Sequence, residues 1–152
     1  MLDIYIDADG CPVKQEVFRV AQRYGLMVTL VANSRIRIKP EPWLSIVVVD
    51  DKFDAADDWI VDHLLPDDIV ITGDILLASR CLKKEAIVLG LRGGAFTKEN
   101  IGDALSSREL HAYLRESGII TGGPSPFAKQ DRSRFLSKLD ETIQGIRRKS
   151  GN

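Results

Sequence analysis

Four acidic residues directly follow hydrophobic runs that are typical of buried β-strands. They are Asp7 and Asp9 after the first run, Asp50 after the third and Asp74 after the fourth. If these runs are parallel strands of one sheet, their carboxyl ends lie along one edge, where open α/β folds build their sites. Carboxylates held a few ångströms apart repel unless a cation neutralises them or their pKa values rise. The spacing therefore predicts a divalent-metal site for Mg²⁺ or Mn²⁺.

The segment 7–13, Asp-Ala-Asp-Gly-Cys-Pro-Val, is the most specific of these signals. A strand that ends in Asp7-Ala-Asp9 and leads into a helix places two carboxylates near the positive end of the helix dipole. The simpler alternative is that Asp9 caps the helix and Asp7 only ends a strand. Cys11 could be a nucleophile activated by the helix, but a buried thiol is the more usual role.

Two further acids, Asp57 and Asp74, are assigned to the same cluster. Asp54 is the expected N-cap of a helix, and Asp57 stands in the first turn of that helix, from which we direct it toward the metal site. Asp74 ends a strand and begins a helix, with Thr72 placed to orient a carboxylate and Gly73 permitting the tight turn. Helix capping alone could also explain Asp57 and Asp74. The predicted catalytic and metal-binding set is Asp7, Asp9, Asp57 and Asp74.

Substrate-binding candidates follow two other strands. Arg92 and Gly93 come after the fifth strand, so a guanidinium group would meet the acidic edge. Arg92 could pair with the carboxylates or clamp a substrate phosphate, and both interpretations stay open. Ser34 and Arg35, in the polar segment after the second strand, complete the candidate set.

Strand-like and helix-like segments alternate along the chain. Strands are expected at 2–7, 26–32, 46–49, 68–72 and 86–91, and helices at 13–24, 55–65, 75–82, 100–116 and from about residue 132. The strands are almost wholly apolar, as in a parallel sheet that helices cover on both faces. We expect a three-layer α/β sandwich with a mainly parallel sheet of about five strands. Residues 1–152 would form one domain, with C-terminal helices from about residue 100 packed on the sheet.

Composition excludes several other classes of protein. The chain has 152 residues and a formal net charge of -1, so its overall charge indicates neither a nucleic-acid nor a membrane partner. Residues 129–152 carry seven Lys/Arg against three Asp/Glu, which leaves 14 against 19 for residues 1–128. No apolar run approaches the ~20 residues of a membrane span, and no signal peptide begins the chain. We expect a cytoplasmic protein with two reduced cysteines.

The motifs together resemble the uncharacterised bacterial YaiI/YqxD family. They are Asp-Ala-Asp-Gly-Cys-Pro-Val at 7–13, Asp-Ala-Ala-Asp-Asp-Trp-Ile at 54–60, Asp-Ile-Val-Ile-Thr-Gly-Asp-Ile-Leu-Leu-Ala at 68–78, Arg-Gly-Gly at 92–94 and Gly-Gly-Pro-Ser-Pro-Phe at 122–127. The likeness covers nearly the whole chain.

That family in turn resembles the PIN-like nucleases, in which acids at strand ends and on a helix bind Mg²⁺ or Mn²⁺ and hydrolyse RNA. This resemblance implies that Asp7 is the first-strand acid, Asp57 or Asp54 the helix acid, and Asp74 the acid of the Thr-x-Asp segment. PIN nucleases usually place one more acid after the next strand, where this chain has Arg92. Either Asp9 substitutes for that acid in a site with a different layout, or the metal is held weakly and activity is low or absent.

Three functions are compatible with these motifs. The leading one is a divalent-metal-dependent phosphodiesterase, specifically a ribonuclease. The same Asp-x-Asp also begins haloacid-dehalogenase-like phosphatases, in which Asp7 would be the covalent nucleophile, Asp9 the general acid and base, and Ser34 a phosphate ligand. The third is a non-catalytic domain that binds RNA through Arg35, Arg37, Lys39 and the basic last helix. The sequence specifies no oligomeric state.

Overall fold

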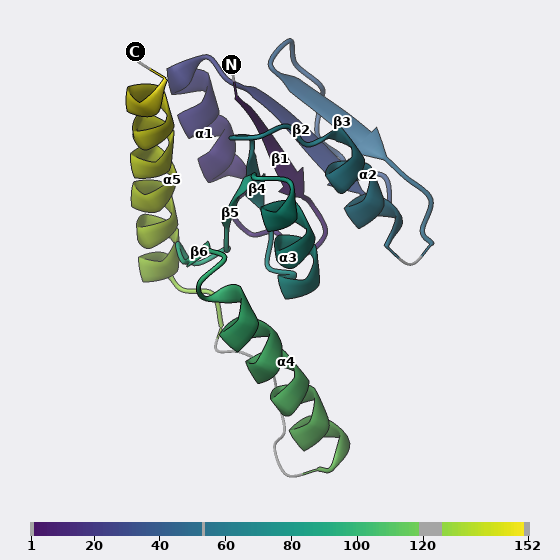
Figure 1. Ribbon diagram of the computed structural model, residues 1–152. Helices are drawn as coiled ribbons and strands as arrows, with labels where there is room; N and C mark the ends of the chain where they lie inside the picture. Colours follow the sequence, from purple (N-terminus) through teal and green to yellow (C-terminus); the bar gives the residue numbers. More distant parts are fainter. Residues whose placement is uncertain (1, 53, 119–125, 151–152) are drawn as a thin grey trace.

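The computed structural model of the chain describes residues 2–52, 54–118 and 126–150, and its strands form one six-stranded sheet (Figure 1). The strands are β1 (Asp3–Asp7), β2 (Met27–Ala32), β3 (Leu44–Val48), β4 (Ile69–Ile71), β5 (Ile87–Leu89) and β6 (Ala95–Phe96). The helices are α1 (Lys14–Tyr24), α2 (Ala55–His63), α3 (Ile75–Lys83), α4 (Ile101–Glu116) and α5 (Lys129–Lys149). The sheet order is β3-β2-β1-β4-β5-β6, with the first five strands parallel.

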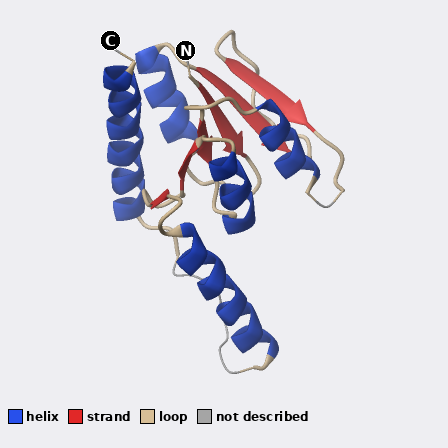
Figure 2. Cartoon of the chain, in the orientation of Figure 1, coloured by secondary structure: helices blue, strands red, loops and turns tan. Residues whose placement is uncertain are grey.

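The predicted three-layer α/β sandwich is confirmed (Figure 2). Even-numbered positions of β1, such as Ile4 and Ile6, are buried in the core beneath α1 and α5. Tyr5, between them, is buried in the second core beneath α2 and α3. Side chains alternate across a strand, so this parity decides which face of the sheet each strand-end residue serves.

The sixth strand, β6, is not among the predicted strands and pairs with β5 antiparallel. The chain reverses direction in a tight turn in which the Gly90 amide donates to the Gly94 carbonyl at 2.7 Å. A Gly-rich turn between two apolar runs is a hairpin signal, but β6 has only two residues and its apolar run is too short to predict a strand.

The end of α1 and the start of α2 both have a residue in the left-handed backbone conformation. Gly25 ends α1 in the left-handed conformation, with φ 66°, as predicted. Asp54 occupies the N-cap position of α2, but its backbone is left-handed, with φ 64°, and its side chain makes no capping bond. The carboxylate of Asp54 is therefore not committed to the helix.

Helix α5 begins at Lys129, three residues before the predicted start. The cause is Asp131, whose Oδ2 accepts a 2.8 Å hydrogen bond from the Ala128 amide and so stabilises an earlier first turn. As expected, α5 packs on the sheet domain through Phe135, Leu139 and Ile143, all fully buried.

Helix α4 differs from the expectation that both C-terminal helices pack on the sheet. It has no buried residue, contacts α3 near its start and extends away from the body (Figure 1). Its apolar side chains alternate with charged ones and form no continuous stripe, so Leu110 and Tyr113 stay exposed. Residues 119–125, which include most of the Gly-Gly-Pro-Ser-Pro-Phe motif, lie outside the described part of the chain. In that described part, no helix is long and apolar enough to cross a membrane.

Candidate functional site

The strand order reverses between β1 and β4, and the main site candidates lie at the carboxyl ends of these two strands. Such a switch point opens a crevice in parallel α/β sheets, because the connections on its two sides run in opposite directions. Ile6 pairs with Ile71 in the parallel register, so the next residues, Asp7 and Thr72, stand side by side on the α2/α3 face. The Thr72 hydroxyl donates a 2.9 Å hydrogen bond to Oδ2 of Asp7.

Asp74 is fixed by the start of α3. Its Oδ1 accepts hydrogen bonds from the amides of Leu76 at 2.9 Å and Leu77 at 3.3 Å, and its own amide donates to the Thr72 hydroxyl at 3.0 Å. Thr72 is fully buried, and its hydroxyl hydrogen-bonds to both acidic residues. It therefore links the two acidic strand ends. Capping and clustering are thus not alternatives for Asp74, because one carboxylate oxygen caps the helix while the side chain lies beside Asp7.

Asp9 does not cap a helix, contrary to the simpler interpretation. Its Oδ2 accepts a 3.0 Å hydrogen bond from the amide of Asn33, which follows β2. Helix α1 begins at Lys14 with no side-chain capping bond. Asp9 therefore joins the loops that follow two neighbouring strands and keeps its carboxylate at the edge of the sheet.

These acids line one cavity of about 570 Å³, which we call the acidic pocket. Its acidic lining residues are Asp7, Asp9, Asp51, Asp54, Asp57 and Asp74. They come from the end of β1 and the loop after it, the segment from β3 into α2, and the loop after β4. All four predicted catalytic and metal-binding residues are among them. Lys52, an exposed side chain, is the one basic residue in the described lining of this pocket.

The carboxylates of this pocket repel each other. The pKa of Asp57 is raised to about 6, first by burial of its side chain and then by the charges of Asp74, Asp7 and Asp54, which outweigh Arg80. Burial also raises the pKa of Asp7, partly offset by the Thr72 hydrogen bond and increased again by Asp74 and Asp9. The pocket is therefore short of positive charge.

The donor chemistry fits a hard divalent cation, because carboxylate oxygens are the ligands that Mg²⁺ and Mn²⁺ prefer. The hydrogen bonds of the described residues use only one oxygen each of Asp7, Asp9 and Asp74. Within the described residues, no three His, Cys, Asp or Glu side chains are close enough to one another to share an ion directly. Mg²⁺ keeps several of its waters in such sites, so water-mediated contacts are compatible with this spacing.

Arg92 does not line the acidic pocket, unlike the arrangement predicted for it. Its Nη1 forms a 3.0 Å ion pair with Oδ2 of Asp131, a buried carboxylate 39 residues later in the chain. Its guanidinium group lies over the Phe127 ring, 5.7 Å from the centroid, in a neighbouring pocket. One of the two interpretations of Arg92 was that it pairs with the carboxylates of the acidic edge. Arg92 does pair with a carboxylate, but that carboxylate belongs to Asp131, outside the predicted cluster.

Gly93 has a clear structural role. Its φ is +89°, and a Cβ atom there would stand 2.8 Å from the carbonyl carbon of Arg134 in α5. Only glycine satisfies both the backbone conformation and this close approach. Gly93 allows the 90–94 turn to pack on α5, and no substrate contact is needed to explain it.

The remaining candidates lie apart from the acidic pocket. Ser34 and Arg35 are exposed, and the lining includes their neighbour Asn33 but neither of them. Asp50 is exposed and also outside the lining, which takes Asp51 from the same segment. Cys11 is the buried thiol that was the favoured interpretation, and burial raises its pKa instead of activating it.

Two lining features were not recognised from the sequence. Asp51 was overlooked because β3 ends at Val48, and the chain then needs three more residues to reach the pocket. Leu91 also lines the acidic pocket and separates it from its neighbour. The acidic run Asp50-Asp51 was a usable signal for Asp51, whereas nothing local in the sequence indicates the position of Leu91.

Comparison with known proteins identifies close relatives but no activity. The model of the "Uncharacterized BCR, YaiI/YqxD family" matches residues 5–145. A UPF0178 protein of Paramagnetospirillum magneticum is 54% identical over 148 residues, covering 97% of this chain and 98% of the relative. A UPF0178 protein of Rhodospirillum centenum is 53% identical over 152 residues, covering 97% and 99%. No solved structure matches the chain.

Proposed function

The chain belongs to the YaiI/YqxD family, and we propose that it is a divalent-metal-dependent phosphodiesterase that hydrolyses RNA. The observation that carries the proposal is the convergence of Asp7, Asp57 and Asp74 on one pocket at the switch point of the sheet. Burial first, and then repulsion by the other acids of the pocket, raises the pKa of Asp57 and Asp7, and a bound cation would remove the repulsion. The resemblance to PIN-like nucleases indicates the same chemistry.

Asp7, Asp9, Asp57 and Asp74 would hold one or two Mg²⁺ or Mn²⁺ ions. Such an ion, when bound, lowers the pKa of a water molecule and neutralises the charge that develops on a phosphate. The residues of this chain provide orientation. Thr72 fixes Oδ2 of Asp7, and the first turn of α3 fixes Oδ1 of Asp74, so the two carboxylates keep their relation when a charged substrate arrives.

The direct test is cleavage of single-stranded RNA with Mn²⁺ or Mg²⁺. We expect Asp7→Asn and Asp74→Asn to lower the rate by at least about 100-fold, as expected when a carboxylate essential to the reaction is neutralised. Asn can still cap α3 at position 74, so this variant should fold. The control is Asp58→Asn, because Asp58 follows the pocket residue Asp57 in α2 but pairs with Arg80 and lies outside the pocket lining.

Other outcomes of the same assays decide between the alternatives. Phosphate release from a small phosphomonoester, with a trapped aspartyl-phosphate on Asp7, would favour the phosphatase. Salt-sensitive RNA binding without turnover would favour a non-catalytic RNA-binding domain. No cleavage across both metals and several RNAs would overturn the proposal. A cytoplasmic location is part of the same proposal, since Cys11 and Cys81 are both free thiols that this compartment keeps reduced.

A further inference from the structure

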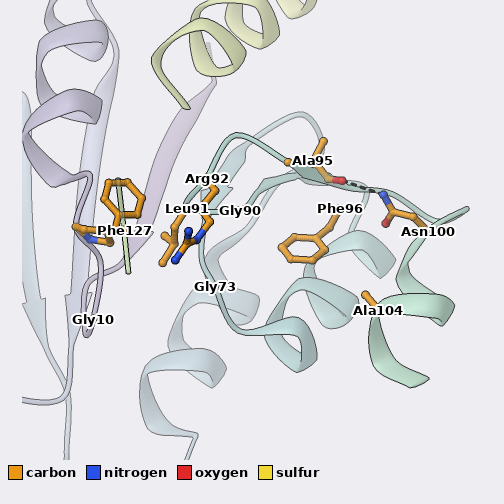
Figure 3. Close-up of a pocket in the computed structure, with 12 residues that line it drawn as sticks. Gly10, Gly73, Gly90, Leu91, Arg92, Ala95, Phe96, Asn100, Ala104 and Phe127 are labelled. Atoms are coloured by element: carbon orange, nitrogen blue, oxygen red, sulfur yellow. Dashed lines mark hydrogen bonds between the residues drawn. The ribbon is translucent and has the colours of Figure 1, made fainter. Parts of the chain in front are cut away.

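A second cavity, of about 600 Å³, adjoins the acidic pocket, and we call it the apolar pocket (Figure 3). The two cavities share Gly10, Gly73 and Leu91 as lining residues, so the apolar pocket begins where the acidic pocket ends. Its volume lies within the range of roughly 300–1,000 Å³ that is usual for small-molecule sites. A ligand that extends past Leu91 would occupy both.

Most of the residues that line the apolar pocket are apolar or glycine. Phe96 of β6 points into the hollow, with Ala104 of α4 below it and Phe127 on the opposite side near Gly10 (Figure 3). A Cβ atom at Gly94 would meet nothing within 4 Å, so the glycine backbone leaves open space in this wall. The Phe96 ring lies close to Gly90, where an added Cβ atom would stand 3.4 Å from Cε2, and the part of the ring that lines the pocket can contact a flat aromatic group.

Polar groups at the rim are held in fixed positions. Asn100 donates from Nδ2 to the Ala95 carbonyl at 2.9 Å and accepts at Oδ1 from the Thr97 amide, also at 2.9 Å. An amide has further donor and acceptor positions, which a base edge can use. Arg92 also lines the pocket, and Asp131 fixes its guanidinium group.

We propose that the apolar pocket binds one unpaired nucleobase of an RNA whose phosphodiester lies at the acidic pocket. Base stacking on aromatic side chains is sequence-tolerant, since every base presents a π-face, and it needs a base that is not paired within a duplex. The substrate class is therefore single-stranded RNA with little sequence preference at this position. This inference deepens the proposed function and rests on it for the position of the phosphodiester.

The experiment measures the binding of adenosine and of ribose to the metal-free protein by NMR, from the shifts of backbone amide signals. Neither probe carries a phosphate, so the test needs neither metal nor turnover. We expect adenosine to bind at least about tenfold more tightly than ribose, as stacking of one base allows. The largest shifts should be at Gly90, Gly94 and Phe96.

Two substitutions place the binding in the apolar pocket. Ala104→Phe adds a large side chain to the cavity from α4, and Gly94→Val adds one from the 90–94 turn, at a position without positive φ. We expect each to weaken adenosine binding about tenfold, the amount that one stacking contact contributes. Ala112→Phe is the matched control, because Ala112 lies on the same helix but outside the pocket lining. It should leave adenosine binding unchanged.

Equal binding of adenosine and ribose, or adenosine binding that survives both pocket substitutions, would overturn the inference. The proposed function fails separately. Adenosine binding in the apolar pocket without any RNA cleavage would reject the phosphodiesterase and keep the base site. RNA cleavage without adenosine binding would keep the phosphodiesterase and reject the base site.

Discussion

Two groups of carboxylates in this chain differ in whether positively charged side chains pair with them. At the junction of the 90–94 turn with α5, the buried Asp131 pairs with Arg92 at 3.0 Å and with Arg134 at 3.3 Å. We call this region the α5 junction. In the acidic pocket, none of the ion pairs among the described residues involves Asp7, Asp57 or Asp74.

The difference shows which group of acids serves the fold. A buried carboxylate that stabilises a structure needs its charge compensated, and the α5 junction supplies two guanidinium groups and a backbone amide. The acidic pocket instead leaves its negative charge uncompensated, at a cost visible in the raised pKa of Asp57. Uncompensated charge in a cleft is a mark of a functional site.

Gly93→Ala should give the largest loss of stability at the α5 junction. A Cβ atom would stand 2.8 Å from a backbone atom of Arg134 and would also strain the positive φ. We expect the free energy of unfolding to fall by about 3 kcal/mol, measured by urea denaturation. Gly94→Ala is the control, since a Cβ there meets nothing within 4 Å, and an equal loss in both variants would contradict a specific close approach.

Asp131→Ala should cost about 2 kcal/mol of unfolding free energy, because it removes two ion pairs and the hydrogen bond to the Ala128 amide. Arg92 and Arg134 are partly exposed, so water compensates them in part and limits the loss. Lys98→Ala breaks the exposed ion pair with Glu85 and should change stability by less than about 0.5 kcal/mol. Similar losses in the two variants would mean that the α5 junction has no special role in stability.

Sequence patterns predicted the acidic pocket far better than the α5 junction. The position of Asp7 and Asp74 depends only on their being at the ends of parallel strands, and such strands are visible as apolar runs. Even the bridging role of Thr72 follows from local spacing. By contrast, Arg92 and Asp131 are 39 residues apart and meet only after the sheet and α5 have packed.

The same reason explains the remaining errors. Asp54 stands where a helix cap was predicted, but its left-handed backbone turns the side chain away from the helix amides, and propensity does not encode that. The position of Arg92 after the fifth strand was predicted correctly, yet the turn at Gly93 and Gly94 leads it to α5 instead of the acidic pocket. For Arg92, packing between distant parts of the chain decided the outcome.

Asp57→Asn should raise the free energy of unfolding, whereas the variants at the α5 junction should lower it. The folded-state pKa of Asp57, about 6, lies above its usual 3.8, so its contribution to stability is largest below about pH 4 and is lost as the pH rises through 6. In metal-free protein at pH 8 we expect Asn to raise the unfolding free energy by about 1 kcal/mol, a value reduced for solvent screening of this half-buried side chain. The gain should vanish below pH 4.

Asp58→Asn is the matched control for this prediction. Asp58 is the next residue in α2, but its exposed carboxylate pairs with Arg80 at 2.9 Å. Neutralising it should give no gain in stability at pH 8. If the two variants behaved alike, neither burial of the Asp57 carboxylate nor its repulsion by the other acids of the pocket would explain the raised pKa at position 57.

Calorimetry of Mn²⁺ binding tests the central claim most directly. The claim is that Asp7, Asp9, Asp57 and Asp74 share one cation site. We expect the wild-type protein to bind Mn²⁺, Asp7→Asn to bind it at least about tenfold more weakly, and Asp58→Asn to bind it as the wild type does. Affinity should also fall below about pH 6, as protons compete for the carboxylates. No binding by the wild type, or equal binding by Asp7→Asn, would contradict the account.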